Sequence, residues 1–514
     1  MKKGQIALGK KQGYKNIVVN LLAFIVQLVL SLYVSPLVVS QVGAAAYGFV
    51  GLAQDFVSYA GIIATVFNSV AARFITDAYY RGDKQKANQY FNSLIITNII
   101  ISSVIGLAGA LFIPNLEKIY IIENSIVFDV KLTFALVFLS YIVTLCTQVF
   151  SVSTFVTNRI DIQGIRNIIQ YFVRFGLTII FLSFISVRIY WIAVAMVIAN
   201  AVIAIMNISL TNKLTPDLKI DPRQTRGVLV KELALSGCWM AISSLSTILI
   251  RGFDLTIANL FLGDYEMGLL SVARTLPNNV TSVISTLAST FVPVFIALYT
   301  KDNIKELVNK INDSVKTMSI VLYFPITGFV VFSNDFYRLW QSSLNNDEVF
   351  AISVLSILTV VQAYFNATTL TLHQVPLVTN KLKIPVLVSL TTGILSIGLE
   401  IILIKYTSLG IYAIVVATTI LLIIQYVFFI PMYSSHCLKI ALNTFYATEI
   451  KSWLMIPILF SVMKTIKLAL PIYSWNTFFI VIVIAGFIGY VLVFLYFYYK
   501  KIVVILKKLF SRVG

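Results

Sequence analysis

Residues 17–42, IVVNLLAFIVQLVLSLYVSPLVVSQV, contain no Asp, Glu, Lys or Arg. A helix rises about 1.5 Å per residue, so this run can cross the ~30 Å hydrocarbon core of a bilayer. Lysines precede it, as in a secretory signal peptide, but the run far exceeds the roughly 7–15 apolar residues of such a peptide. We therefore predict a first transmembrane helix that is retained.

The rest of the chain has a similar composition. Of its 514 residues, 59% are hydrophobic and 12% are charged, whereas soluble domains carry roughly 25% charged residues. The apolar residues fall into blocks of about 20 or more, each long enough to span the bilayer as a helix. A membrane β-barrel is excluded because its strands would be alternating segments of about ten residues. The sequence predicts an all-α, polytopic membrane protein.

The net charge of +18 raises the question of nucleic-acid binding, because basic proteins often bind phosphate backbones. The basic residues, however, lie in short loops between the apolar blocks, which is the pattern of a membrane protein. We expect no nucleic-acid partner. The three cysteines, Cys146, Cys238 and Cys437, form neither a disulfide framework nor a CxxC metal motif.

Fourteen transmembrane spans can be read along the chain. They lie at about 16–41, 46–73, 89–113, 130–155, 165–186, 190–211, 233–262, 267–297, 315–334, 349–375, 384–405, 409–433, 452–472 and 475–499. With both termini in the cytoplasm, the cytoplasmic loops are 73–88, 156–166, 212–232, 298–316, 376–383 and 434–451. Without Arg73, these loops and the tails hold 28 Lys or Arg, against seven on the external side and at the outer ends of the spans. Since Lys and Arg favour cytoplasmic loops, we predict this orientation.

An internal repeat relates the two halves of the chain. Gly43-x4-Gly48 recurs as Gly263-x4-Gly268, and the sequence VTNR at 156–159 recurs as VTNK at 378–381. The charged loop Arg81-Gly82-Asp83-Lys84-Gln85-Lys86 matches the position of Lys301-Asp302-Asn303-Ile304-Lys305. Six helices followed by six related helices form a parallel repeat. We predict a six-helix lobe at 1–211, a cytoplasmic connection at 212–232, a second six-helix lobe at 233–434, and two further helices with a basic tail at 435–514.

No motif indicates an enzyme. Gly4-x4-Gly9-Lys10-Lys11 resembles a nucleotide-binding loop, but Lys11 replaces the Ser or Thr that holds magnesium, and no strand can precede it. The only histidines, His373 and His436, are far apart in the sequence. We expect no catalytic residue, no metal site and no cofactor, although a transported proton or sodium ion could be coupled to the activity.

Polar residues recur every three, four or seven positions in spans 1, 2, 7 and 8, which gives each helix one polar face. Gln27 lies on this face of span 1, Gln54 lies in span 2, and Asn278 lies on the face of span 8. A polar face can line a cavity. It is also typical of contacts between packed membrane helices, and this alternative stays open for the hydroxyl residues.

Charged residues near mid-bilayer are the stronger indication, because each costs at least ~2.5 kcal/mol there. Asp55, Arg251 and Arg274 all lie roughly 16–18 Å from the outer surface by helical rise. They are expected to meet in a water-filled cavity between the lobes. The alternative is a structural ion pair, for example between Arg251 and Asp254 at i and i+3.

Two further arginines are candidates for the cavity. Arg174 lies about eight residues into span 5 and either lines the cavity or is structural. Arg73 lies at the inner end of span 2. It either anchors the helix at the membrane surface or guards the cavity entrance.

Together these features resemble a known superfamily. Four features are similar to those of the multidrug/oligosaccharidyl-lipid/polysaccharide exporters. They are the two six-helix halves, the Gly-rich entry to span 2, the loop Arg81-Gly82-Asp83 and the two extra C-terminal helices. Within that superfamily the chain is most similar to the O-antigen-type (Wzx) polysaccharide flippases. The resemblance implies that spans 1, 2, 7 and 8 line a central cavity. The lipid II flippases, which also have fourteen spans and cavity arginines, remain an alternative branch.

The resemblance implies a flippase in the bacterial inner membrane that moves a polyprenyl-pyrophosphate-linked oligosaccharide outward by alternating access. Its partners would be this lipid-linked substrate, membrane lipids, and a polysaccharide polymerase with chain-length proteins. Arg suits the pyrophosphate because its planar fork binds two phosphate oxygens. The flippase function competes with that of a cation-coupled multidrug exporter, which would need a more acidic cavity, and with that of a membrane scaffold that transports nothing.

Overall fold

Every regular element in the described part of the protein is helical. The structure is a computed structural model, and it describes the backbone of residues 2–510 and the side chains of residues 12, 15, 16 and 18–497. Within this part of the chain, fourteen helical segments are long and apolar enough to cross a membrane, and no strand is present. The predicted all-α fold with about fourteen transmembrane helices is confirmed.

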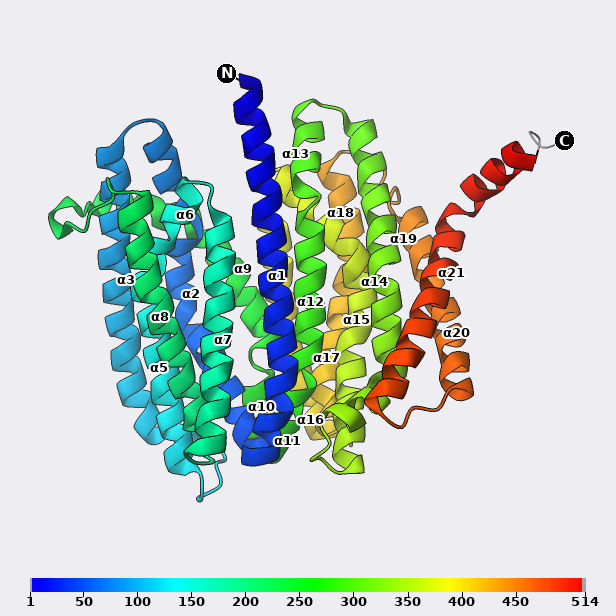
Figure 1. The fold of residues 1–514 in the computed structure, drawn as a ribbon, viewed down its shortest axis with the longest axis horizontal. Coiled ribbons are helices and arrows are strands. Elements are labelled where there is room, and N and C mark those ends of the chain that lie inside the picture. Colours follow the sequence, from blue (N-terminus) through cyan, green and yellow to red (C-terminus); the bar gives the residue numbers. More distant parts are fainter. Residues whose placement is uncertain (1, 511–514) are drawn as a thin grey trace. The chain divides into compact units, whose positions relative to one another are not determined.

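The helices form two compact units, residues Met1–Val272 and Ala273–Gly514. The first unit contains the following helices, all but α4 labelled in Figure 1: α1 (Lys2–Val42), α2 (Ala44–Tyr80), α3 (Lys84–Phe112), α4 (Leu116–Ile119), α5 (Val127–Gln148), α6 (Val152–Val156), α7 (Ile160–Phe184), α8 (Tyr190–Leu214), α9 (Gly227–Arg251), α10 (Asp254–Phe261) and most of α11 (Asp264–Ala273). Helix α9 falls in this unit because it packs along α2. The lobe boundaries predicted above rest on the sequence repeat rather than on contacts, and they stay a prediction.

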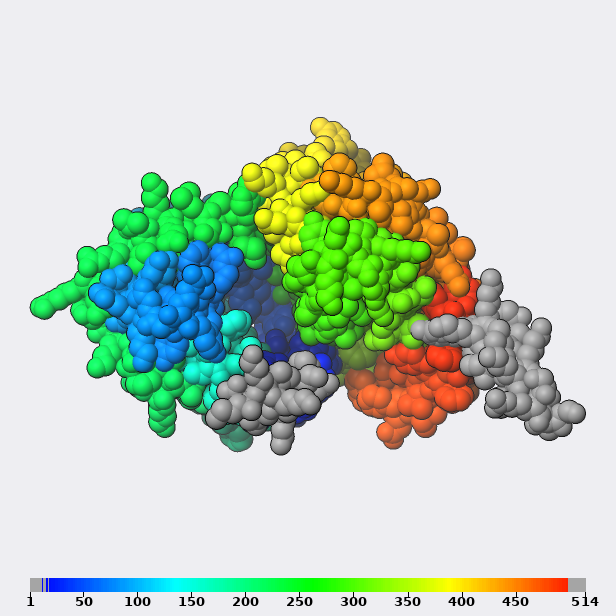
Figure 2. Space-filling view, turned by 90° about the horizontal axis from the view of Figure 1, so that it is seen from above, coloured from blue at the N-terminus to red at the C-terminus, as the bar shows by residue number. Residues whose placement is uncertain are grey.

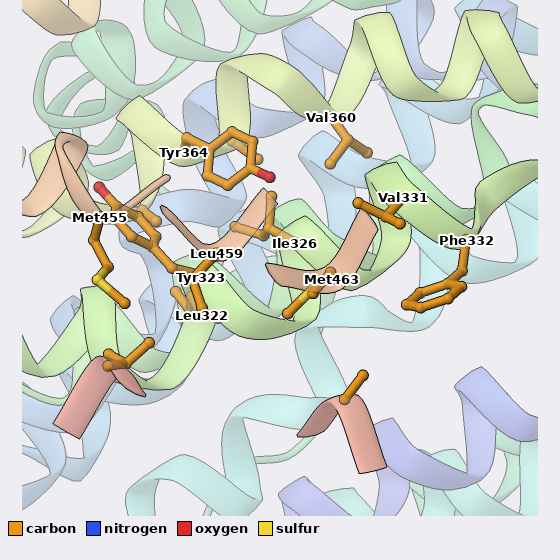
Figure 3. Close-up of a cluster of buried hydrophobic side chains, with 14 of the residues drawn as sticks. Leu322, Tyr323, Ile326, Val331, Phe332, Val360, Tyr364, Met455, Leu459 and Met463 are labelled. Atoms are coloured by element: carbon orange, nitrogen blue, oxygen red, sulfur yellow. The ribbon is translucent and has the colours of Figure 1, made fainter. Parts of the chain in front are cut away.

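The second unit contains the remaining helices: α12 (Thr275–Ser289), α13 (Val292–Thr300), α14 (Ile304–Trp340), α15 (Asn346–Val378), α16 (Lys383–Tyr406), α17 (Tyr412–Ile424), α18 (Ile430–Cys437), α19 (Tyr446–Trp453), α20 (Met455–Ala469) and α21 (Trp475–Phe510). Its core joins the two C-terminal helices to the rest of the unit. Figure 3 shows Met455, Leu459 and Met463 of α20 in one buried cluster with Leu322 and Ile326 of α14. The extra helices are therefore integral to the second unit.

The repeated sequence landmarks share a backbone conformation. In each pair, matching residues have positive φ angles: Gly43 (85°) and Gly263 (123°), Gly82 (82°) and Asp302 (54°), Asn158 (53°) and Asn380 (56°). Gly, Asn and Asp are the residues that tolerate this conformation. The following helices also start alike, since the Asp83 side chain caps α3 and the Asn303 side chain caps α14. The repeat thus encodes the same turns and helix starts in both halves.

The second glycine of each Gly-x4-Gly motif serves close packing. Gly48 of α2 and Gly268 of α11 lie against each other, and a Cβ on Gly48 would be 2.9 Å from the Gly268 Cα. A Cβ on Gly268 would be 2.4 Å from the carbonyl oxygen of Ala44. Side chains at these positions would hold the helices apart, so the motif pairs the starts of α2 and α11.

The connection between α8 and α9 is bound to the turn between α2 and α3. Lys84 forms a 2.7 Å ion pair with Asp217, and the Asn92 side chain donates a hydrogen bond to the Lys219 carbonyl. The hydrogen bond from the Lys84 ammonium lowers the pKa of the Asp217 carboxyl below its ordinary value. Figure 2 looks onto this end of the unit, with the α2–α3 turn in light blue beside green residues of the connection.

Candidate functional site

The predicted seventh span is interrupted at its charged residues. Helix α9 ends at Arg251 and α10 begins at Asp254, with Gly252 and Phe253 between them. The Gly252 carbonyl accepts a hydrogen bond from the hydroxyl of Tyr59 in α2, so the backbone at the break is satisfied without a continuous helix. The sequence had indicated one helix over residues 233–262, and only Gly252 hinted at the break, because glycine weakens a helix interior.

The eighth span is interrupted in the same way. Arg274 separates α11 from α12. Three residues later stands Pro277, which has no N–H to donate to the carbonyl of Ala273, four residues before it. Instead, that carbonyl accepts hydrogen bonds from Ser356 (2.6 Å) and Tyr337 (3.4 Å). Both candidate arginines therefore lie at helix breaks, a feature of substrate sites in transporters.

Asp55 lies on α2 at the level of the first break. A Cβ on Gly51, one turn before it, would be 3.0 Å from the Leu255 side chain of α10. Tyr59, one turn after it, stacks on Phe253 with ring centroids 4.8 Å apart. Residues spaced by four share one helix face, so α2 presents Asp55 to the segment that carries Arg251 and Asp254. These contacts place the part of α2 around Asp55 against the segment that carries Arg251 and Asp254, and all three residues are half-buried.

The other predicted residues are more dispersed. Gln54 adjoins Asp55 on α2, and Gln27 is half-buried on α1. Arg174 is half-buried on α7, with its guanidinium 5.5 Å from the ring of Phe175. Asn278 is exposed on α12, in the second unit with Arg274.

Arg73 lies well away from the charged cluster. It is exposed on α2, with its guanidinium 5.0 Å from the ring centre of Phe74. It follows Asp55 by 18 residues, which is roughly 27 Å along the helix. A place at the end of the span agrees with either of its predicted roles, surface anchor or entrance residue.

A polar cavity inside the first unit was not anticipated from the sequence. Its volume is about 530 Å³, and helices α2, α5, α7 and α8 line it. The lining includes Gly61, Asn68, Tyr141, Gln148, Gln163, Arg166, Asn167, Gln170, Asn200 and Asn207. Of the seventeen lining residues, seven carry a side-chain amide and six carry a hydroxyl, and no Asp or Glu lines the cavity.

Arg166 is the residue that the sequence pattern misplaced. It was counted with the basic residues of a cytoplasmic loop at 156–166, but α7 begins at Ile160 and buries Arg166 to 2% exposure. Span 5 is predicted from about residue 165, so the helix begins about five residues earlier than expected, and Arg166 lies inside it. The spacing Gln163, Arg166, Asn167, Gln170 could have revealed a polar helix face.

No metal site is apparent in the residues that the structure describes: no three His, Cys, Asp or Glu side chains gather there in a way that could hold an ion. The expectation of a coupled proton or sodium ion stays a prediction. The carboxylates that could serve are Asp55 and Asp254.

Comparisons with known proteins agree with this architecture. Residues 14–299 match the family described as polysaccharide biosynthesis protein. The uncharacterized membrane protein EpsK of Bacillus subtilis (strain 168) is 25% identical over 465 residues, which cover 90% of each chain. The fold is similar to the lipid II flippase MurJ in an inward closed conformation (TM-score 0.70, 14% identity, 95% of this chain and 99% of that one). It is also similar to an inward-facing multidrug resistance MATE transporter of the MOP superfamily (TM-score 0.67, 16% identity, 81% and 99%).

Proposed function

The chain belongs to the polysaccharide biosynthesis protein family, and from this membership, together with a fold similar to that of a MOP-superfamily transporter, we propose that it is a lipid-linked oligosaccharide flippase. Its substrate is an oligosaccharide on a polyprenyl pyrophosphate, which it moves from the cytoplasmic to the external leaflet of a bacterial cytoplasmic membrane. The product supplies surface polysaccharide assembly. A polymerase and chain-length proteins are the partners that such assembly requires.

The observation that carries this proposal is the position of Arg251 and Arg274 at the breaks of the seventh and eighth spans. A pyrophosphate needs cationic donors, and a guanidinium offers two parallel N–H groups to phosphate oxygens. Helix breaks inside a membrane are tolerated where they are buried in protein or line a water-filled cavity, and broken helices carry the substrate sites of many transporters. The two arginines therefore combine the charge and the setting that a lipid pyrophosphate requires.

The driving force follows from the charge of the substrate. An anion that moves outward is favoured by an inside-negative potential by about 2.3 kcal/mol per charge per 100 mV. In the proposed mechanism the two halves rock against each other and expose the arginines to one side at a time. The lipid tail stays in the bilayer while the sugar crosses in water.

A second candidate is lipid II transport, because the likeness to MurJ extends over 95% of this chain. Both candidates carry a polyprenyl pyrophosphate, so the arginines serve either one. The two candidate functions differ in the sugar that is transported and in whether the gene is essential. A cation-coupled multidrug exporter is disfavoured, because Asp55 and Asp254 share their region of the first unit with Arg251.

The direct test is the fate of lipid-linked sugars in a strain that lacks the protein. Deletion should cause a lipid-linked oligosaccharide to accumulate in the cytoplasmic leaflet and should remove the surface polysaccharide. Lipid II accumulation with lysis would favour the second candidate. Unchanged glycolipids together with increased drug sensitivity would refute both and favour the multidrug exporter.

A further inference from the structure

A second polar site lies within the first unit. Helices α2, α5, α7 and α8, all from that unit, line this partly open cavity of about 530 Å³. Neither arginine that we assign to the pyrophosphate lines it. The cavity is therefore separate from the arginines that we assign to the pyrophosphate.

Arg166 defines the charge of this occupant. Its side chain is 2% exposed, and its Nε and Nη1 atoms have no hydrogen-bond partner among the described residues. Buried polar groups are almost always hydrogen-bonded, and an uncompensated buried charge is strongly unfavourable. The carboxylate of Asp161, five residues earlier on α7, is bound to Lys15 (2.8 Å) and Arg159 (3.2 Å) and does not line the cavity. A bound anion would supply the missing acceptor.

The amides around Arg166 indicate the rest of the ligand. Gln170 donates a hydrogen bond to Asn200, which in turn donates to the Ser140 hydroxyl (2.7 Å). Asn68 is held by reciprocal hydrogen bonds with Asn98 of α3. Amides both donate and accept hydrogen bonds, so a set of them held in place suits the hydroxyl groups of a sugar.

The volume separates a sugar from a simple ion. Small-molecule sites have volumes of about 300–1,000 Å³, and this cavity, at about 530 Å³, falls in that range. A single inorganic anion at Arg166 would leave most of the space and most of the amides unused. A sugar ring with an acidic substituent would fill the space and would form hydrogen bonds with the amides.

We propose that this cavity binds an acidic sugar, one that carries a carboxylate or a phosphate. Arg166 binds the oxyanion, and the amides of α7 and α8 bind the ring hydroxyls. Because the proposed function supplies a glycan as cargo, the inference rests on that function and deepens it: the site selects the class of sugar that the flippase carries. Such a ligand could be an acidic sugar of the glycan or a free sugar phosphate, because both combine an oxyanion with ring hydroxyls.

Binding to the purified full-length protein in lipid nanodiscs tests the assignment. The probes are glucuronate and glucose 1-phosphate, with glucose and inorganic phosphate as comparisons, measured by calorimetry. We expect both acidic sugars to bind at least about tenfold more tightly than glucose or phosphate alone, and Arg166→Gln to lose at least about tenfold in affinity. The matched control is Arg81→Gln, since Arg81 is an exposed arginine in an i,i+4 ion pair, and it should bind like the original protein.

A second variant covers the case in which Arg166→Gln does not fold. Gln163→Glu places a carboxylate three residues before Arg166, a spacing at which helical side chains meet. It should satisfy the guanidinium, leave the protein folded and abolish binding of acidic sugars. Unchanged binding in Gln163→Glu would refute the site, and equal affinity for phosphate and glucose 1-phosphate would refute its selectivity for a sugar.

Glycan export distinguishes failure of this inference from failure of the proposed function. If acidic sugars bind at Arg166 but the deletion strain accumulates no lipid-linked glycan, the flippase assignment fails. If that strain accumulates glycan but no acidic sugar binds, the flippase assignment stands and the acidic-sugar site is refuted. If the glycan carries both a carboxylate and a phosphate, the affinities of glucuronate and glucose 1-phosphate are compared. The probe that binds more tightly identifies the group that Arg166 binds, and weak binding of both probes refutes the site.

Discussion

At the scale of single residues, the guanidinium groups determine what the membrane region can bind. Arg251 and Arg274 lie at helix breaks, and each offers planar N–H pairs that a Lys ammonium cannot reproduce. An Arg-to-Lys substitution keeps the positive charge but loses this planar geometry. Such a substitution therefore distinguishes a phosphate-binding role from a structural ion pair.

The first prediction concerns Arg274. Hydrogen bonds to a charged group contribute about 1.5–3 kcal/mol, a factor of about 10 to 100. Arg274→Ala should therefore reduce glycan export about 100-fold and Arg274→Lys about tenfold, with the amount of folded protein unchanged in both. Export is measured in complemented cells, and folding by detergent chromatography. A loss of folded protein with Arg274→Ala would instead indicate a structural ion pair.

The second prediction concerns coupling through carboxylates. Asp55 and Asp254 share one level of the first unit with Arg251, and buried carboxylates near mid-bilayer can hold a proton or a cation. If they couple transport to an ion, Asp55→Asn and Asp254→Asn should slow transport and remove its dependence on pH or sodium in proteoliposomes. Unaltered ion dependence would mean that these carboxylates only neutralise the arginines.

At the scale of elements, single residues decide where helices break and how closely they pack. Pro277 removes the donor that would satisfy the Ala273 carbonyl, and Ser356 replaces it from α15. Gly48 and Gly268 allow α2 and α11 to touch. Two predictions follow from these features, one for each.

The third prediction is that the break at Arg274 is needed for movement rather than for stability. Pro277→Ala restores an N–H at this position and favours one continuous helix from α11 to α12. We expect a melting temperature equal to or above that of the original protein, with glycan export reduced several-fold. The companion variant Ser356→Ala should lower stability by about 1–3 kcal/mol, because the Ala273 carbonyl loses its 2.6 Å hydrogen bond. Full export by Pro277→Ala would contradict a role for the break.

The fourth prediction concerns the glycine contact. Gly268→Ala places a Cβ 2.4 Å from the Ala44 carbonyl oxygen, and overpacking of this kind typically costs about 1–3 kcal/mol. Gly398→Ala is the matched control, because no atom lies within 4 Å of the added Cβ. Thermal unfolding in detergent should show a lower midpoint for Gly268→Ala and an equal or higher one for Gly398→Ala. Equal midpoints in both variants would mean that α11 shifts at no cost.

At the scale of the whole molecule, the placement of charge predicts how the chain crosses the membrane. The Lys- and Arg-rich loops alternate with loops that have few basic residues, which orients a membrane protein with its basic loops inside. The fifth prediction is that residues 215–231 are cytoplasmic and residues 115–128 external. Single cysteines in a variant without Cys146, Cys238 and Cys437 would report this through an impermeant reagent. Labelling at 215–231 in intact cells would refute the orientation.

The sequence by itself determined the fold class, because long apolar runs and the turns between them are local properties. The fourteen spans, the repeated turns at Gly82 and Asp302, and the capping residues Asp83 and Asn303 depend on neighbours a few positions away. The candidate charges Arg251 and Arg274 were found in the same way, since a charge inside an apolar run is visible in the sequence.

Tertiary structure alone decided which polar groups meet. Arg166 looks like a loop residue in the sequence, and only the packing of α2, α5, α7 and α8 around it buries its side chain and forms the cavity. The break at Arg274 likewise depends on the Ser356 hydroxyl, 83 positions away from Ala273, which satisfies a freed carbonyl. Burial and hydrogen-bond satisfaction are properties of surroundings assembled from distant parts of the chain, so a pattern read along one helix does not contain them.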